Sequence, residues 1–443
     1  MKATIPCATK LITYTLIALW LPTVPAQDLS NDEVILVSQC LAVAAQQSWE
    51  LGTRAQAILS LNATSYSVLT PSTPLPPARS IPDSLTSPLA PFFEIARSTV
   101  ANRGNSNKNI TGPQPLMADG SAADPASIGF AVLLANWTGQ GLHDGLDYAG
   151  AAKDQLDYLQ FDVPRTSDGA ISHRVSQVQL WSDFVYMVPP FLAYYGMITG
   201  NRTLLVEAHD QIRLYRSYLR DTTANNLWKH VLLGTSGNDP GHWSTGNAWA
   251  AAGMLRVLGT IKNSQYANTL KPQQKDLAAW VLEIHGAMYP NLDPSSSLFP
   301  NYASQPASAP NNFLDASSTA LLASTVYRLS LLWGTHKYLP YAERTRHALS
   351  APNTNTSAPS NMTLLHIDAG GWLTPVVNPH SYGQEGAQSA EGQAFVVEMQ
   401  AAWRDWVADG SKGANAALRT GSAGMGMRGW ALVVLGICAG VLV

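Results

Sequence analysis

The sequence predicts an all-α fold, because apolar residues recur at helical spacing and the alternation typical of strands is missing. The clearest case is Thr203–Leu219, where Leu205, Ile212 and Leu219 share one stripe and charged residues lie off it. Roughly ten to twelve helices of similar length suit either an α-solenoid or a closed helical toroid. No fixed repeat is visible in the sequence, which counts against TPR or HEAT arrays.

The first predicted helix is long, covering Glu33–Leu59, with Asn31 or Asp32 as its N-cap. A connection rich in proline, serine and threonine follows over residues 70–91. Further helices are expected to start near Ala126, Asp144, Pro190, Thr203, Ala248, Pro272, Ala316, Pro340 and Glu391. Several connecting loops are rich in Trp, His, Asn, Gly and Asp, and functional residues tend to lie in such loops on a rigid scaffold.

Both ends of the chain carry patterns typical of processing signals. Residues 1–26 resemble a secretory signal peptide, with lysines, an apolar run over 11–21 and a cleavage point after Ala26. Residues 413–443 have the order of a glycosylphosphatidylinositol (GPI) signal, and Asn415, or else Gly413, is the expected attachment residue. A short tail-anchor helix is the competing interpretation of the apolar tail. One domain over residues 27–412 is predicted between these signals.

Six Asn-X-Ser/Thr sequons agree with a secreted glycoprotein held at the cell surface by its lipid anchor alone. They begin at Asn62, Asn109, Asn136, Asn201, Asn355 and Asn361. After processing only Cys40 would remain, which excludes an intramolecular disulfide and a thiolate metal site. The net charge of −3 and the lack of a basic cluster argue against a nucleic-acid partner. No nucleotide loop, paired-histidine helix or EF-hand loop indicates a cofactor or a metal.

Four motifs occur in order along the central and C-terminal parts of the chain. They are Gln179–Gly196 (with Trp181-Ser182-Asp183), Leu227–His230, Trp243–Trp249 and Ser389–Phe395, and Asp315–Ala320 is a weaker fifth. In these motifs the chain resembles the unsaturated glucuronyl and rhamnogalacturonyl hydrolases of glycoside hydrolase families 88 and 105. The resemblance implies an (α/α)6 barrel, the six-hairpin toroid of these glycosidases, which agrees with the closed-toroid alternative.

The resemblance also implies a reaction. Its substrate would be an oligosaccharide, from pectin or another cell wall, that ends in a 4,5-unsaturated uronic acid. The C4=C5 bond of that sugar is an enol ether, so an acid can protonate C4 while water attacks C5, and the resulting hemiketal opens and expels the aglycone. The family's catalytic aspartate corresponds to Asp183, which would act as both acid and base.

Burial of Asp183 among Trp181, Phe184 and Tyr186 is expected to raise its pKa and so keep it protonated near neutral pH. The alternative is that Asp183 only caps the N-terminus of the helix that follows. The residues expected to bind the sugar are Gln179, Trp181, His230, Thr245, Asn247 and Trp249. Both tryptophans would be stacking platforms, and the histidine and the two amides would be hydrogen-bonding partners.

Two positions depart from the family pattern or leave it open. Thr245 stands where the family has an arginine, and threonine cannot offer a uronate the bidentate cation that arginine does. The family's second acidic residue corresponds either to Ser127 or, if the loop shifts, to Asp124. His173 and Arg174 match a family Asp-Gly…His segment loosely.

Two other functions compete with the hydrolase. One is a non-catalytic surface protein that binds glycans in the cleft of the same barrel. The other is a cell-wall transglycosidase like the GPI-anchored α-1,6-mannan enzymes of family 76. That family relies on adjacent aspartates, and this sequence contains no Asp-Asp pair.

Overall fold

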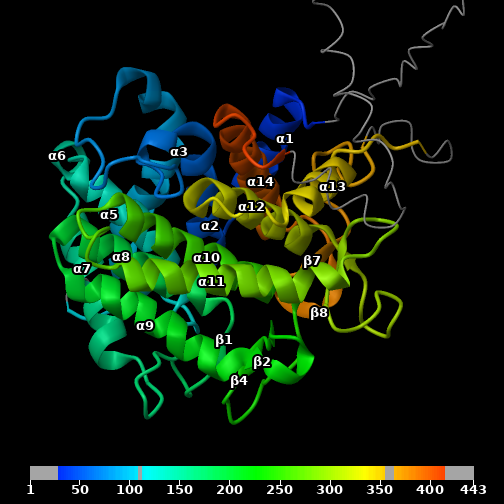
Figure 1. Ribbon diagram of the computed structural model, residues 1–443. Coiled ribbons are helices and arrows are strands. Elements are labelled where there is room, and N and C mark those ends of the chain that lie inside the picture. Colours follow the sequence, from blue (N-terminus) through cyan, green and yellow to red (C-terminus); the bar gives the residue numbers. More distant parts are fainter. Residues whose placement is uncertain (1–27, 108–111, 355–363, 415–443) are drawn as a thin grey trace, which may run out of the picture.

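The computed structural model describes residues 28–107, 112–354 and 364–414 (Figure 1). Its helices are α1 (Asn31–Ala44), α2 (Ser48–Asn62), α3 (Asp83–Ala101), α4 (Arg103–Asn107), α5 (Gly129–Trp137), α6 (Gly141–Asp144), α7 (Tyr148–Asp157), α8 (Phe184–Thr199), α9 (Arg202–Leu219), α10 (Ser244–Asn263), α11 (Lys271–Met288), α12 (Ala316–Trp333), α13 (Leu339–Leu349) and α14 (Ala390–Ala408). Shorter helical turns are η1 (Thr64–Tyr66), η2 (Asp124–Ile128), η3 (Tyr158–Asp162), η4 (Thr222–Ala224) and η5 (Tyr289–Asn291).

Within the described ranges, the longer helices form two concentric rings. The inner ring is α2, η2 with α5, α8, α10, α12 and α14, each packed on the next, and α14 returns to pack on α2. The outer ring is α1, α3, α7, α9, α11 and α13, each packed against inner helices. In Figure 1 two of these outer helices, α9 and α11, lie side by side along the barrel. This closed ring confirms the predicted all-α, (α/α)6 barrel.

The two rings differ in burial as their sequences require. Helix α10 is buried on all sides from Ser244 to Ile261, since inner helices contact protein all round. The outer helix α9 buries one stripe that includes Leu205, Ile212 and Leu219, and its charged residues face away from the core. The predicted helix Thr203–Leu219 is therefore confirmed, with one additional residue at its start.

Short antiparallel strand pairs lie in the loops between the helices. They are β1 (Leu180–Trp181) with β4 (Val231–Leu232), β2 (Arg220–Asp221) with β3 (Leu227–Trp228), β5 (Phe299–Pro300) with β6 (Leu314–Asp315), and β7 (Val376–Asn378) with β8 (Ser381–Gly386). In the first pair Trp181 lies opposite Val231, so the loops before α8 and before α10 are held together. The sequence did not predict these strands, because most of them are only two residues long.

The predicted single helix over Glu33–Leu59 is wrong, because the chain breaks after α1 and restarts at α2. The Glu50 carboxylate accepts hydrogen bonds from the backbone N–H groups of Gln46 (2.8 Å) and Gln47 (2.9 Å), which starts a new helix there. The predicted N-cap is also wrong by one or two residues. Ser30 caps α1 in a capping box with Glu33.

The predicted connection over residues 70–91 is too long, because α3 begins at Asp83 and includes Pro88 and Pro91. Its buried stripe, which includes Phe92 and Ile95, packs on the inner ring and offsets the backbone hydrogen bonds that the prolines remove. Helix α8 likewise begins at Phe184, ahead of the expected start near Pro190.

Several predictions concern residues outside the described ranges. These are the signal peptide over 1–26, the attachment residue Asn415 with the apolar tail, and the sequons at Asn109, Asn355 and Asn361. The sequon asparagines that are described, Asn62, Asn136 and Asn201, all have exposed side chains. Among the described helices, none combines the length and the apolar character needed to cross a bilayer.

The inner ring depends on a close approach of α10 to α8 at Gly253. A methyl group at this position would overlap the backbone carbonyl of Val185, which cannot move without shifting α8. Gly253→Ala is therefore expected to lower the free energy of unfolding by about 2 kcal/mol or more, as overpacking does. Chemical denaturation monitored by circular dichroism measures this change.

Gly286→Ala is the matched control, because Gly286 is also a helical glycine, in α11. A methyl group at this position would have the Tyr338 hydroxyl as its nearest neighbour, at 3.4 Å, which is an ordinary contact. Alanine there should leave stability unchanged or raise it by up to ~1 kcal/mol. Equal effects of the two substitutions would contradict the close-approach argument.

Candidate active site

A cavity of about 450 Å³ lies at the end of the barrel where the inner helices begin. Its wall includes Trp49 at the start of α2, Asp183 before α8, Trp243 before α10 and Glu391 at the start of α14. The inner helices therefore point their N-termini toward one pocket. The partial positive charge of helix N-termini makes such a place favourable for an anionic ligand.

Asp183 occupies the N-cap position of α8 but does not cap it. Its side chain accepts no hydrogen bond from the backbone of the helix, and the carboxylate instead lines the pocket, 13% exposed. One neighbouring donor is the Ser182 hydroxyl, 3.1 Å from Oδ2. The interpretation of Asp183 as a mere helix cap is therefore not supported.

The strand pair β1–β4 brings His230 opposite Asp183. The Ser182 N–H donates to the His230 carbonyl (2.9 Å), and the imidazole Nε2 lies 3.5 Å from Asp183 Oδ2. The ring is fully buried among the aromatic rings of Trp181, Trp243 and Tyr382. This packing fixes the orientation of the imidazole toward the carboxylate.

A second carboxylate holds the other side of the same ring. His230 Nδ1 lies 2.9 Å from Asp239 Oδ2, which also accepts a hydrogen bond from the Tyr302 hydroxyl at 2.8 Å. Burial by itself disfavours the charged ring, but Asp183 and Asp239 outweigh it and raise the pKa of His230 above its ordinary value. The two carboxylates therefore favour the positively charged form of the ring.

The expected rise in the pKa of Asp183 is wrong. Burial does favour the protonated form, but the contact with the positive ring of His230 outweighs burial, and the pKa of Asp183 lies below its ordinary value. The prediction considered only the apolar neighbours Trp181, Phe184 and Tyr186, whereas the strand pair adds a cation that the local sequence does not show.

Two other carboxyl groups in the pocket have the opposite shift. Burial, with the nearby charges of Asp119 and Asp183, raises the pKa of Asp124 well above its ordinary value. Burial and the charge of Asp183 do the same to the pKa of Glu391, which accepts a hydrogen bond from Trp49 Nε1 at 2.7 Å. The surroundings thus favour the anionic form of Asp183 and the protonated forms of Asp124 and Glu391.

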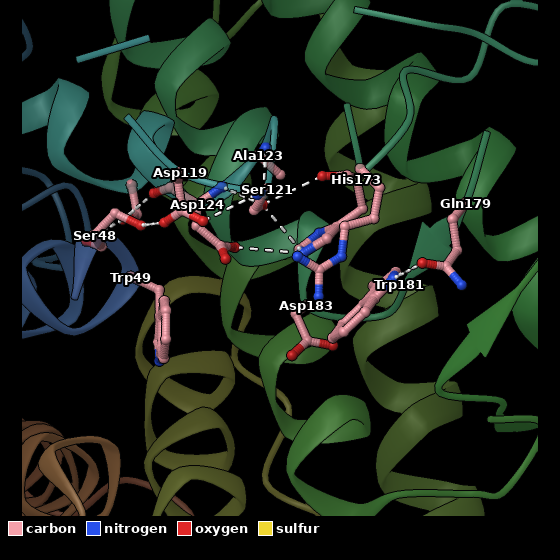
Figure 2. Close-up of polar contacts among 12 residues, drawn as sticks. Ser48, Trp49, Asp119, Ser121, Ala123, Asp124, His173, Gln179, Trp181 and Asp183 are labelled. Atoms are coloured by element: carbon pink, nitrogen blue, oxygen red, sulfur yellow. Dashed lines mark hydrogen bonds and ion pairs between the residues drawn. The ribbon is translucent and has the colours of Figure 1, made fainter. Parts of the chain in front are cut away.

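The alternative between Ser127 and Asp124 is decided by their positions. Asp124 lines the pocket, and its Oδ1 lies 3.5 Å from His173 Nε2 (Figure 2). Ser127 is buried, and its hydroxyl donates to the Asp124 carbonyl at 2.6 Å. Of these two residues, Asp124 is therefore the one whose side chain lines the pocket.

Trp181 lines the pocket, and Gln179 holds the edge of its indole ring. The indole Nε1–H donates to Gln179 Oε1 at 2.9 Å, as Figure 2 shows, and the Gln179 amide donates to the carbonyls of Ser236 and Gly237. The amide of Gln179 thus forms its hydrogen bonds within the protein, and these hold the indole of Trp181 in position. His173 stacks nearly parallel on the same indole, with 4.7 Å between ring centroids.

Trp249 also reaches the pocket, from the first turns of α10. It is fully buried against Tyr186 and Phe395, and its indole N–H has no hydrogen-bond partner among the described residues. It forms part of the pocket floor and leaves one donor without a protein acceptor.

Thr245 and Asn247 do not line the pocket, so their predicted role in binding the sugar is corrected. The Thr245 hydroxyl lies 3.2 Å from Asp315 Oδ2, the carboxylate that caps α12. The Asn247 amide bonds to both backbone groups of Trp228 at 2.9 and 3.0 Å and so holds the segment that ends in His230. Both side chains are fully buried and lie outside the pocket lining.

Several pocket residues were not identified from the sequence. Tyr382 comes from the β7–β8 hairpin and Trp49 from α2, both distant along the chain from Asp183. Asp239 was missed as well; it contacts the His230 ring from outside the pocket lining and lies in a polar loop with no pattern of its own. Glu391 lies inside a recognised motif, but only the fold shows that it faces the same cavity as Asp183.

Comparison with known proteins agrees with this barrel. The model of the family described as Glycosyl Hydrolase Family 88 matches residues 93–370, well over half of the chain. No curated protein matches the chain.

Three solved structures illustrate the structural likeness. A possible member of glycoside hydrolase family 105 from Klebsiella pneumoniae has a TM-score of 0.60 at 15% identity, covering 89% of this chain and 99% of its own. A family 88 glycosyl hydrolase from Bacteroides vulgatus gives 0.55 at 14%, with coverage of 85% and 99%. An unsaturated glucuronyl hydrolase specific for heparin gives 0.56 at 13%, with coverage of 86% and 97%.

The Asp183–His230–Asp239 contacts predict a specific effect of Asp239→Asn. Loss of one carboxylate makes the charged form of His230 less favourable, so the pKa of His230 should fall. The pKa of Asp183 should then rise, because a less charged His230 stabilises its carboxylate less. Magnetic resonance titration of isotope-labelled histidine rings measures the first shift, with His230→Gln identifying the signal.

The matched control is Asp221→Asn, because Asp221 Oδ2 also faces a histidine at 3.2 Å, but that histidine, His242, does not line the pocket as His230 does. It should leave the titration of His230 unchanged. An unaltered His230 titration in Asp239→Asn would show that Asp239 does not set the charge of this ring.

Proposed function

The chain belongs to glycosyl hydrolase family 88, and from this premise we propose that it removes a terminal 4,5-unsaturated uronic acid from oligosaccharides. The proposed reaction is hydration of the C4=C5 double bond rather than direct displacement at the glycosidic carbon. One solved structure with the same fold is named as an unsaturated glucuronyl hydrolase, which supports this substrate class. Fragments of pectin or of another cell-wall polysaccharide are the proposed source of the substrate.

The observation that carries the proposal is the position of Asp183. Its carboxylate is buried in the pocket, leaves the helix N-terminus uncapped and faces the imidazolium of His230 at 3.5 Å. A buried acid–base pair of this kind holds one proton that can move between its members as charge enters the site. An ordinary glycosidase would instead need two carboxyl groups across the glycosidic bond.

The proposed steps use this proton. The entering anionic sugar favours the neutral form of Asp183, which takes the proton from His230 and delivers it to C4. Positive charge then develops at C5, next to the ring oxygen, and water attacks there while the Asp183 carboxylate accepts a proton from it. The resulting hemiketal opens, the aglycone leaves, and the pair holds one proton again.

Asp124 and Glu391 support the same substrate. Burial raises the pKa values of both and so favours their protonated forms, which donate hydrogen bonds to hydroxyl groups without repelling a uronate. The pocket is also of the size usual for small ligands, and its tryptophans offer apolar surface to the faces of a sugar ring.

We propose in addition that the protein is secreted, glycosylated and anchored to the cell surface by GPI. This rests on the terminal signals and on the six sequons of the sequence. The exposure of Asn62, Asn136 and Asn201 is compatible with glycans at these positions.

The substrate proposal predicts loss of the ultraviolet absorbance of the C4=C5 bond when unsaturated disaccharides are added. Asp183→Asn should lower kcat by about 10²–10⁴-fold, because an amide neither delivers nor accepts the proton. Asp210→Asn, an exposed carboxylate on α9, should leave kcat unchanged.

Unchanged absorbance with rhamnogalacturonan, glucuronan and ulvan fragments would remove this substrate class. Full activity of Asp183→Asn would remove Asp183 from the chemistry. Thermal unfolding of each variant shows whether a loss of activity reflects a loss of the fold.

A further inference from the structure

The pocket offers an anionic substrate few basic side chains. Four carboxyl groups line it, those of Asp119, Asp124, Asp183 and Glu391. Among its described lining residues, Arg174 is the one arginine, and none is a lysine. A carboxylate that enters this pocket therefore meets a single permanent cation.

The backbone of Arg174 is held in place on both sides. Arg174 forms an antiparallel bridge with Ser121, and its N–H donates to the Ser172 hydroxyl at 3.1 Å. The side chain, in contrast, is half-buried and forms no ion pair with any described carboxylate within 4.0 Å. The backbone that carries the guanidinium is thus held in place, while no described carboxylate pairs with its charge.

The guanidinium packs on an indole that belongs to the site. Its carbon Cζ lies 4.5 Å from the ring centroid of Trp181, two residues before Asp183. A cation–π contact of this kind holds the planar group in one orientation and leaves its N–H donors free. Its charge also acts on groups across the pocket, lowering the pKa values of Asp124 and Tyr382 below what burial alone would give.

The position at which the resemblance led us to expect an arginine cannot provide this charge. Thr245 is fully buried beneath the pocket, and its hydroxyl contacts the carboxylate that caps α12. A cation that binds the substrate carboxylate must therefore come from another loop.

We infer that Arg174 binds the carboxylate of the terminal unsaturated uronic acid and so makes the pocket selective for the free acid over its ester. The inference rests on the proposed function and adds to it the residue that recognises charge. A planar guanidinium can donate two parallel hydrogen bonds to a carboxylate, which an uncharged methyl ester accepts far less well. Binding there leaves the double bond near Trp181 and Asp183, on whose side of the pocket Arg174 lies.

The test compares two substrates that differ only in this charge. They are an unsaturated digalacturonate and the same disaccharide methyl-esterified on the unsaturated ring. Wild type should prefer the acid, and Arg174→Gln should raise KM for the acid about 10- to 100-fold, the usual loss for a charge-assisted pair. KM for the ester and kcat for both substrates should change less than about 3-fold, because the proton-transfer groups are intact.

Two variants accompany this comparison. Arg174→Lys keeps the charge without the planar pair of donors and should recover part of the preference for the acid. Arg213→Gln, an exposed arginine on α9 away from the pocket, should behave as wild type. Thermal unfolding checks that each variant is folded.

Equal losses for the acid and the ester in Arg174→Gln, or an unchanged KM for the acid, would overturn the role of Arg174 and leave the proposed function standing. If wild type turns over neither disaccharide, the proposed function fails instead. Titration calorimetry with the same two disaccharides then tests whether Arg174 binds the carboxylate, independently of turnover. Preferential binding of the acid that disappears in Arg174→Gln supports the inference, and its absence in wild type overturns it.

Discussion

The closure of the inner helical ring is the constraint on which the site depends. A ring of inner helices that all begin at the same end brings Trp49, Asp183, Trp243 and Glu391 together from distant parts of the chain. Close helix contacts such as that at Gly253 set the diameter of the ring, and hence the distances between these side chains. The helices alone do not bring His230 opposite Asp183. The short strand pair β1–β4 does so.

Charge in the pocket follows from this geometry. Two flanking carboxylates favour the charged form of His230, and the contact with His230 favours the ionised form of Asp183 despite its burial. For Asp124 and Glu391 burial is the largest influence, and it raises the pKa of both carboxyl groups. The pocket thus combines the Asp183–His230 pair with two carboxyl groups whose protonated forms are favoured and with the guanidinium of Arg174.

Much of this was predictable from periodicity and motifs, and the failures have physical causes. Helix α9 was found because its apolar stripe is regular, whereas the break before α2 depends on Glu50 capping with a glutamine, a weak sequence signal. The resemblance to families 88 and 105 led to Asp183 and His230 as residues of one site, and both line the same pocket. Thr245 and Asn247 were assigned to the sugar because a motif shows which residues are adjacent in the chain but not which of them face the cavity.

The most direct test of the account is to follow the origin of each atom added to the sugar. With the reaction run in deuterium oxide or in heavy-oxygen water, hydration predicts deuterium at C4 and the new oxygen at C5 of the released uronate. Magnetic resonance and mass spectrometry of the product locate both labels. A product that keeps its double bond and carries the heavy oxygen at C1 would contradict the account, because it would show direct cleavage of the glycosidic bond.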